Sequence, residues 1–375
     1  DWHATKYFMM FGVAEDHDSN PIKKGIGTIK SRKGTKYVSV NPVQSGYAAI
    51  ADEWLGIRPG TDGLFIGALI AELLKAEKID WDFLIRYTNS PWLVIDSPGT
   101  PYHGLFVRNG SGEPMCYNSE KKTIEKMQVG KSKPAMVGEY DLGDGTIAVP
   151  AFQHIVKEFL SDKYELSNVE KETGIKARDI ERIAAEMAEV AFEEEIVIDQ
   201  EWIDSYGNKH DKVVGRPVSF HAMRGIAAHK NGFETCRMLH MLQMVLGAID
   251  GPGSFRYKPP FPRPTPPHKK NAKAAAAPGE VCTAEPLGFP AGPEDLAVDE
   301  NGEPTRLDKA FSWEYPLAIH GMMHMALHNA WAGDPYKVDV LMMYMANMAW
   351  NSSMNVENAI KYMTDKDPET DDYKI

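Results

Sequence analysis

The sequence predicts an α/β fold, with a doubly wound and mostly parallel sheet followed by part of a second α/β domain. Short, wholly apolar runs such as residues 7–11 alternate with amphipathic segments such as residues 180–187, which is the pattern of parallel strands joined by crossover helices. The chain has 375 residues, whereas single domains usually contain roughly 100–200. We therefore expect two or three packed units.

The first forty residues indicate a strand, a helix and a second strand. Residues 7–11 predict a buried strand that ends at Gly12, and Pro21 marks the first turn of a helix. Residues 37–40 predict the second strand, which stops at an Asn-Pro pair. Such a βαβ unit is right-handed, and open α/β sheets bind ligands at the carboxyl ends of their strands.

The later segments continue in the same style, with two interruptions. Residues 98–149 are rich in Gly, Ser, Pro and charge, which indicates a long excursion from the sheet. Residues 252–304 hold 12 of the 25 prolines, which indicates a linker. The other expected elements are helices at 64–74, 79–87, 152–160, 180–187, 231–246 and 356–363, and strands at 196–198, 218–220 and 338–345. The expected domains are 1–250, a dinucleotide-cradle α/β domain; 251–310, a Pro-rich linker; and 311–375, a partial second α/β nucleotide-binding domain.

The composition excludes several classes of protein. Hydrophobic residues make up 43% and charged residues 25%, which is typical of a soluble globular chain. The three cysteines are too far apart to form a zinc or iron–sulfur ligand set of their own. With 53 acidic and 41 basic residues the net charge is -12, so we expect no nucleic-acid partner.

No segment of the sequence addresses or anchors the chain. It has no signal peptide and no uncharged apolar run of roughly 18 residues. It opens at Asp1 without an initiator Met, and it closes on an acidic loop that leads into what reads as another strand. We therefore expect a piece of a longer protein.

Three loops carry candidate binding residues. The turn after Gly12 resembles a nucleotide-binding turn but lacks GxGxxG, and Asn41 stands where a nicotinamide enzyme would place an acid. Residues 58–62, RPGTD, either cap the following helix or accept the paired N–H donors of a guanine edge while Arg58 holds a phosphate. Residues 224–232 either suit an anionic ligand or form a solvated loop in which Asn231 caps a helix.

Methionines and histidines gather near the end of the chain. Met325, Met342, Met343 and Met345 fit core filling better than copper ligation. His320, His324 and His328 recur on one helix face where two could chelate zinc, but no HExxH completes the set. We therefore favour a partner-facing or solvated stripe and expect no metal ligand in this chain.

The order of these motifs resembles the catalytic subunits of the molybdenum-bis(molybdopterin guanine dinucleotide) oxidoreductases, the dimethyl sulfoxide reductase and formate dehydrogenase superfamily. The string at 51–62, ADEWLGIRPGTD, is close to the family's AD-W-L-IRPGTD signature and is the most specific feature. Residues 172–185 and 232–253 resemble two further family segments, and residues 340–355 resemble its second nucleotide-binding half-unit. The stretches at 215–237 and 259–264 most resemble polysulfide, thiosulfate or tetrathionate reductases and sulfite dehydrogenases.

The resemblance implies roles for individual residues. The implied cofactor-binding residues are Gly12, Val13, Ala14, Asn41, Pro42, Arg58, Gly60, Thr61, Asp62, Arg224 and Gly225. Arg256 lies near the position where some relatives hold a substrate-facing arginine, and is the implied catalytic residue. Residues 347–353 would meet the second dinucleotide. The family's molybdenum ligand and its cysteine motif for a 4Fe-4S cluster fall outside this chain, so the isolated piece is expected to be inactive.

The resemblance also implies partners. The full enzyme would exchange two electrons with an inorganic sulfur anion and would work with an iron–sulfur electron-transfer subunit, together with a membrane anchor subunit. It would be a soluble protein at the cytoplasmic or periplasmic face of a bacterial membrane complex. Two alternatives stay open from the residues: an NAD-dependent dehydrogenase on the same architecture, and a non-catalytic assembly module.

Overall fold

The structure is a computed structural model that divides into two compact units. The described residues are 1–13, 21–32, 34–100, 102–204, 206–256, 325–333, 337–348 and 356–375. The first unit comprises Asp1–Ser97 and Phe106–Tyr257, and the second comprises Pro98–Leu105 and Lys258–Ile375. Much of the expected linker at 251–310 lies outside the described residues.

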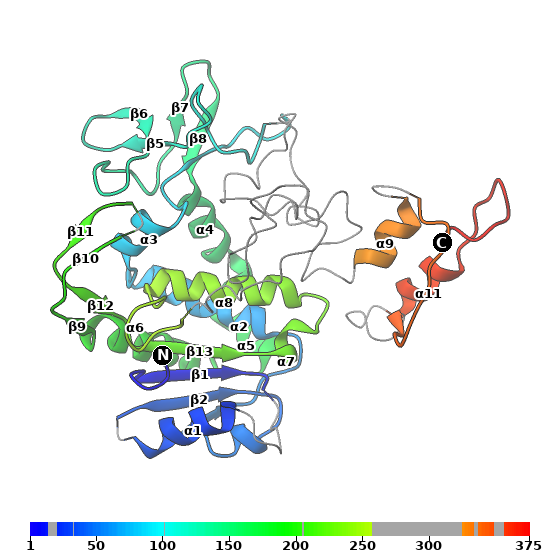
Figure 1. The fold of residues 1–375 in the computed structure, drawn as a ribbon, viewed down its shortest axis with the longest axis horizontal. Helices are drawn as coiled ribbons and strands as arrows, with labels where there is room; N and C mark the ends of the chain where they lie inside the picture. Colours follow the sequence, from blue (N-terminus) through cyan, green and yellow to red (C-terminus); the bar gives the residue numbers. More distant parts are fainter. Residues whose placement is uncertain are drawn as a thin grey trace, which may run out of the picture. The chain divides into compact units, whose positions relative to one another are not determined.

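A four-stranded parallel sheet forms the centre of the first unit (Figure 1). Its strands, in spatial order, are β13 (Val218–Ala222), β1 (Tyr7–Phe11), β2 (Lys36–Val40) and β3 (Glu53–Leu55). Met9 of β1 pairs with Phe220 on one side and with Val38 on the other. The predicted apolar strands are thus confirmed, and the mixed α/β class with a parallel sheet is correct. The short β3 was not predicted, because three residues show no periodicity.

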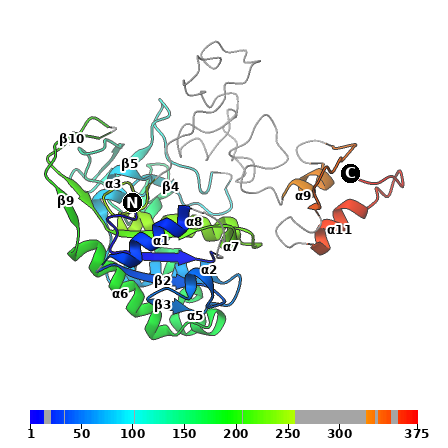
Figure 2. The same cartoon turned by 60° about the horizontal axis from the view of Figure 1, so that its bottom comes forward.

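Helices cover both faces of this sheet. Tyr7, Met9 and Phe11 face a core that includes the buried sides of α2 (Asp62–Lys75), α6 (Ala177–Glu193) and α8 (Gly232–Leu246). The alternate residues Phe8 and Met10 pack with α1 (Pro21–Ser31), which lies in front of the strands in Figure 2. All five β1 side chains are at most 1% exposed. Burying such a side chain contributes about 1.5–3 kcal/mol, so this strand anchors the unit.

Turn, capping and glycine residues explain where several of the helices begin and end. α2 starts directly after the Pro-Gly turn, and its nearly continuous apolar surface is buried, as the sequence predicts. α8 ends at Gly247, whose left-handed backbone favours glycine. In α3 (Trp81–Tyr87), the Asp80 carboxylate caps the helix by accepting from the Phe83 amide. α5 (Leu166–Thr173) ends in the same way as α8, at Gly174.

The excursion and the segment before β13 form short antiparallel strands. β4 (Leu93–Ile95), β8 (Ile147–Pro150) and β7 (Tyr140–Asp141) make one sheet, which leads into α4 (Ala151–Phe159). The two-stranded pairs are β5 (Met115–Asn118) with β6 (Thr123–Lys126), β9 (Ile196–Ile198) with β12 (Val213–Gly215), and β10 (Trp202–Ile203) with β11 (Lys209–His210). The remaining helical segments are α7 (Arg224–Ala227) and the 3-10 turns η1 (Gly46–Ala48) and η2 (Asp162–Tyr164).

The described part of the second unit holds α9 (Met325–Ala332) and α11 (Val356–Thr364). Trp331 joins them: its Nε1 donates to Asp365 at 2.8 Å, and its ring lies 5.2 Å from that of Tyr362. The predicted helix at 356–363 is confirmed. The described residues do not test a nucleotide-binding domain at 311–375, which stays a prediction.

The predicted strand at 338–345 is wrong. No strand is found over these residues, and Val340 is 79% exposed and Met342 85% exposed. Met345 is 91% exposed and has a positive φ of 50°, which a strand does not allow. The core-filling role proposed for Met342, Met343 and Met345 is wrong for the same reason. An apolar run forms a strand only when a neighbouring strand supplies hydrogen bonds, and that condition is not local.

Replacing Gly67 by alanine is expected to destabilise the first unit. A Cβ at this position of α2 would lie 2.0 Å from the ring of Tyr164, which is 2% exposed. Overpacking of this kind costs about 1–3 kcal/mol. Thermal denaturation should show a lower Tm for Gly67→Ala. Gly27→Ala is the matched control, because its Cβ would meet nothing within 4 Å; an unchanged Tm for Gly67→Ala would contradict the packing described.

Candidate functional site

The carboxyl ends of the four parallel strands bring most of the predicted binding residues to one edge of the sheet. Gly12 follows β1, Asn41 follows β2, and the RPGTD turn at 58–62 follows β3. Arg224 and Gly225 follow β13 and begin α7, at the right-hand ends of the strands in Figure 1. Ala14 lies outside the described residues. This edge is the place where α/β sheets bind ligands.

Two glycines cross closely at this edge. Gly12 has a φ of +57°, and its amide donates to the Val40 carbonyl at 2.9 Å. A Cβ on Gly225 would lie 1.9 Å from the Gly12 carbonyl oxygen, so only glycine fits there. β1 leads to α1 on one face of the sheet, while β13 leads to α8 on the other. The boundary between strands whose connections leave to opposite faces is a topological switch point, the usual position of a ligand crevice.

Asn41 joins the ends of β1 and β2. Its Nδ2 donates to the Val13 carbonyl at 3.4 Å, and its Oδ1 accepts from the Val43 amide at 3.2 Å. Trp54 Nε1 donates to the Asn41 carbonyl at 2.7 Å. Val13 is buried and the neighbouring Pro42 is exposed. Asn41 therefore shapes this part of the edge through internal hydrogen bonds.

The RPGTD turn is held by hydrogen bonds of its own. Arg58 Nη1 donates to the carbonyls of Lys171 at 2.6 Å and Glu172 at 3.3 Å, at the end of α5. The Thr61 hydroxyl donates to the Arg58 carbonyl at 2.8 Å and makes no capping bond to α2. The expectation that this turn presents the start of a helix is confirmed, since α2 begins at Asp62. Of the two alternatives for this turn, capping of the helix is not made by the Thr61 side chain.

Asp62 is a buried carboxylate at this edge. Its residue is 5% exposed. Burial raises the pKa of the Asp62 carboxyl above its usual value, while a hydrogen bond from its own amide and the charge of His229 act in the opposite direction. The two oxygens of such a carboxylate suit a planar ligand that presents two N–H donors side by side, because a carboxylate can accept two parallel hydrogen bonds.

The loop between β13 and α8 meets the RPGTD turn. Asn231 Nδ2 donates to the Gly60 carbonyl at 3.1 Å. The nearest atom to a Cβ placed on Gly60 is Nδ1 of His229, at 3.7 Å. Arg224 is exposed beside Gly225. Asn231 does occupy the N-cap position of α8, but its side chain does not cap the helix.

Arg256 lies apart from these residues. Its guanidinium is 3.7 Å from the Asp250 carboxylate, and its charge acts on the amino group of Asp1, at the start of the chain that leads into β1. The five residues of β1 separate that end from Gly12 by about 16 Å of strand. The structure therefore does not bring the predicted catalytic residue to the predicted cofactor residues. Residues 349–353 of the second predicted dinucleotide segment lie outside the described residues.

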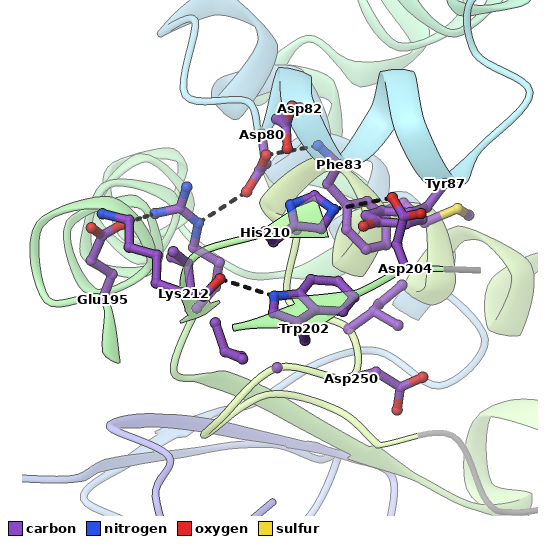
Figure 3. Close-up of a pocket in the computed structure, with 17 residues that line it drawn as sticks. Asp80, Asp82, Phe83, Tyr87, Glu195, Trp202, Asp204, His210, Lys212 and Asp250 are labelled. Atoms are coloured by element: carbon purple, nitrogen blue, oxygen red, sulfur yellow. Dashed lines mark hydrogen bonds and ion pairs between the residues drawn. The ribbon is translucent and has the colours of Figure 1, made fainter. Parts of the chain in front are cut away.

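A cavity of about 790 Å³ opens at the opposite edge of the sheet, beside the start of β13 (Figure 3). Trp202 stacks on His210, with ring centroids 4.4 Å apart. Arg216 Nε lies 3.0 Å from Asp80, and its Nη1 lies 2.6 Å from Glu195. Sequence reasoning missed this cluster, because the cavity is lined by three separate stretches, around residues 80–87, 195–216 and 244–251, that share no spacing.

Asp204 is the most strongly perturbed acid beside this cavity. Burial would raise its pKa, but hydrogen bonds from His210, Asn208 and nearby backbone amides outweigh burial and hold the pKa of Asp204 well below its usual value. His210 Nε2 lies 3.0 Å from Asp204 Oδ2, and the Asp204 side chain is 1% exposed. The carboxylate thus ties β10 to β11 rather than offering itself to a ligand.

The described residues hold no cluster of three or more side chains suited to a metal ion. Burial raises the pKa of the Cys116 thiol to about 11 and also raises that of Cys236, so neither is an activated nucleophile. His328 packs its ring 5.3 Å from that of Tyr362. Cys282, His320 and His324 lie outside the described residues.

Comparisons with known proteins identify the family. No family model matches the chain. The whole chain aligns with a sulfite dehydrogenase subunit of Allochromatium vinosum at 47% identity over 386 residues, which is 40% of that protein. The formate dehydrogenase major subunit of Haemophilus influenzae is 24% identical over 59% of this chain and 18% of its own length. The chain belongs to the dimethyl sulfoxide reductase family of molybdopterin oxidoreductases.

Two further comparisons cover smaller or more distant matches. A dimethyl sulfoxide reductase of Haemophilus influenzae is 25% identical over 37% of this chain and 20% of its own length. Acetylene hydratase from Pelobacter acetylenicus superposes on 68% of the chain and 23% of its own, with a TM-score of 0.40 and 15% identity. The chain therefore spans 40% of the sulfite dehydrogenase relative and less of the others. Among the helices that the structure describes, none has the length and apolarity needed to cross a bilayer.

Replacing Asp204 by asparagine is expected to lower stability at neutral pH. The native contribution of this carboxylate is fully present above the unfolded pKa of about 3.9 and is lost as pH falls toward the lower folded pKa. The Tm difference between Asp204→Asn and the parent should therefore be largest near pH 7 and should shrink below about pH 4. Asp211→Asn, an exposed acid on the same segment, is the control. A pH-independent difference would show that the hydrogen bonds, and not the charge, stabilise this turn.

Proposed function

We propose that this chain is the central portion of the catalytic subunit of a molybdenum-bis-MGD oxidoreductase that carries out two-electron redox of an inorganic sulfur compound. The candidates are sulfite, thiosulfate, polysulfide and tetrathionate. The identity of 47% with a sulfite dehydrogenase subunit favours sulfite. The observation that supports the cofactor role is the gathering of the predicted binding residues at the carboxyl edge of the parallel sheet.

The residues at this edge fit one guanine dinucleotide. The close backbone crossing of Gly12 and Gly225 leaves no side chain between a pyrophosphate and the main chain. Asp62 would accept the N–H donors of the guanine edge, and the exposed Arg58 and Arg224 would face phosphate and pterin. Gly60 and Thr61 belong to the same turn as Asp62, while Val13, Asn41 and Pro42 lie at the ends of β1 and β2 at the same edge. On this proposal, the sheet is of the doubly wound, dinucleotide-binding type.

Two helix N-termini support binding of the phosphate groups. α2 and α8 both start at this edge, and neither receives a side-chain cap from its N-cap residue, Thr61 or Asn231. The positive end of a helix dipole favours an anion, and no N-cap side chain stands in its way at either helix. Residues 1–250 would thus form the cradle, and residues 311–375 would contribute part of a second nucleotide-binding domain.

The molybdenum cofactor would supply the redox chemistry when it is bound. For sulfite, water provides the added oxygen and the products are sulfate, two protons and two electrons. The residues of this chain would bind and orient the dinucleotide, and the described residues hold no group of three or more side chains suited to a metal ion. The family resemblance implies that Arg256 lies near an anionic substrate. Arg256 itself lies at the end of β1 opposite to Gly12.

The proposal includes partners outside this chain. The electrons would pass to a 4Fe-4S cluster and an iron–sulfur subunit, with a membrane anchor subunit completing the complex at one face of a bacterial membrane. The Allochromatium vinosum relative is named as one subunit of its sulfite dehydrogenase, which supports a multi-subunit enzyme. The nicotinamide alternative has less support, because Asn41 offers its amide and not an acid at the end of β2.

Metal and nucleotide analysis of the polypeptide at its full length tests the proposal. We expect molybdenum and guanine nucleotide in the purified protein, with electron transfer from sulfite to an artificial acceptor. Absence of both molybdenum and guanine nucleotide would exclude a molybdopterin role and would support the non-catalytic module.

Gly225→Ala is expected to lower the molybdenum content at least about tenfold, because its Cβ would push the Gly12 loop out of place. Gly27→Ala, also a helical glycine but one whose Cβ would meet nothing within 4 Å, should retain the parental content. Elemental analysis of both variants, with circular dichroism to confirm folding, makes the comparison. Parental molybdenum in folded Gly225→Ala would show that the crossing does not contact the cofactor.

A further inference from the structure

Asn231 departs from the behaviour expected of its position. It stands at the N-cap of α8, where an asparagine side chain usually accepts a hydrogen bond from the first turn of its own helix. Here that bond is absent, and Nδ2 instead donates to the Gly60 carbonyl at 3.1 Å, on a turn 171 residues away in sequence. The side chain therefore connects two loops instead of ending one helix.

The turn that Asn231 holds is the one that presents Asp62. Gly60 has a φ of +82°, and it precedes the buried carboxylate by two residues. The first turns of α2 and α8 also pack directly, since a Cβ on Gly63 would lie 2.8 Å from the Thr235 hydroxyl. The position of Asp62 is thus set on one side by helix packing and on the other by the Asn231 amide.

In the part of the chain that the structure describes, no other side chain donates a hydrogen bond to the Gly60 carbonyl. Thr61 donates back to Arg58, and Arg58 donates to the end of α5. His229 lies near Gly60 and acts on Asp62 through its charge. A change of a few tenths of an ångström in the turn would misalign a carboxylate that must meet two parallel N–H groups.

We propose that Asn231 is a positioning residue for guanine recognition: by holding the Gly60 carbonyl, it aligns the Asp62 carboxylate with the guanine edge. This inference rests on the proposed function, because it assumes that Asp62 contacts a guanine. The role predicted for Asn231 is in selectivity, not in catalysis. Its loss weakens the contact to the exocyclic amine of guanine more than binding of the nucleotide as a whole.

Nucleotide selectivity provides the test. The full-length polypeptide, produced without the pterin cofactor, is titrated by calorimetry with GMP and with IMP, which lacks only the exocyclic amine. We expect the parent to prefer GMP by about tenfold or more, the effect of a hydrogen bond to a charged group. Asp62→Asn should bring this ratio close to one.

Asn231→Asp separates positioning from helix capping. Aspartate is as good an N-cap as asparagine but cannot donate to a carbonyl. We expect Asn231→Asp to lower the GMP preference about fivefold or more while its Tm stays near that of the parent. Asn168→Asp is the matched control, since Asn168 of α5 also donates its Nδ2 to a main-chain carbonyl, that of Lys163 in η2, at 3.0 Å.

The outcomes are distinguishable. A parent that binds neither nucleotide, or binds both equally, contradicts the proposed guanine site itself. A parent that prefers GMP, with the preference lost in Asp62→Asn and kept in Asn231→Asp, contradicts only the role of Asn231. If Asn231→Asp fails to fold, Asn231→Ser replaces it, because serine keeps a capping hydroxyl on a side chain too short to reach Gly60. The ratio of GMP affinity to IMP affinity in this variant then tests the role of Asn231.

Discussion

The parallel pairing of β1 with β13 is the interaction on which the rest of the structure depends. Tyr7 to Phe11 run in register with Val218 to Ala222, although the two strands are far apart in sequence. Since both strands end at the same edge, their following loops meet, and Gly12 lies against Gly225. A shift of one residue would turn every side chain of β1 to the other face, so two different cores hold this register.

The two edges of the sheet use their polar residues differently. At the amino edge, Arg216 pairs with Asp80 and Glu195, and Asp204 lies within hydrogen-bond distance of His210, so these polar groups satisfy one another within the protein. At the carboxyl edge, main-chain groups approach closely and Asp62 is buried with only a local partner and the charge of His229. Polar groups at the amino edge thus pair with one another, whereas on our proposal those at the carboxyl edge contact the cofactor, as in other open α/β sheets.

Local rules fail at the candidate site in an informative way. Thr61 and Asn231 both occupy N-cap positions, yet neither caps its helix. Each side chain is used instead to hold a loop, so neither helix receives a side-chain cap from its N-cap residue. Departures from local preference are expected at functional sites, because function and local stability place different demands on the same residue.

The sequence by itself determined the strands at 7–11 and 218–220, the helices around 64–74 and 231–246, and the family signature at 51–62, because periodicity and motif chemistry belong to contiguous residues. Only the tertiary structure decided that Asn231 reaches Gly60, that Trp202 stacks on His210, and that Arg256 lies at the opposite end of β1 from Gly12. It also decided against a strand at 338–345. Each of these outcomes depends on a partner distant in the chain, which no local pattern specifies.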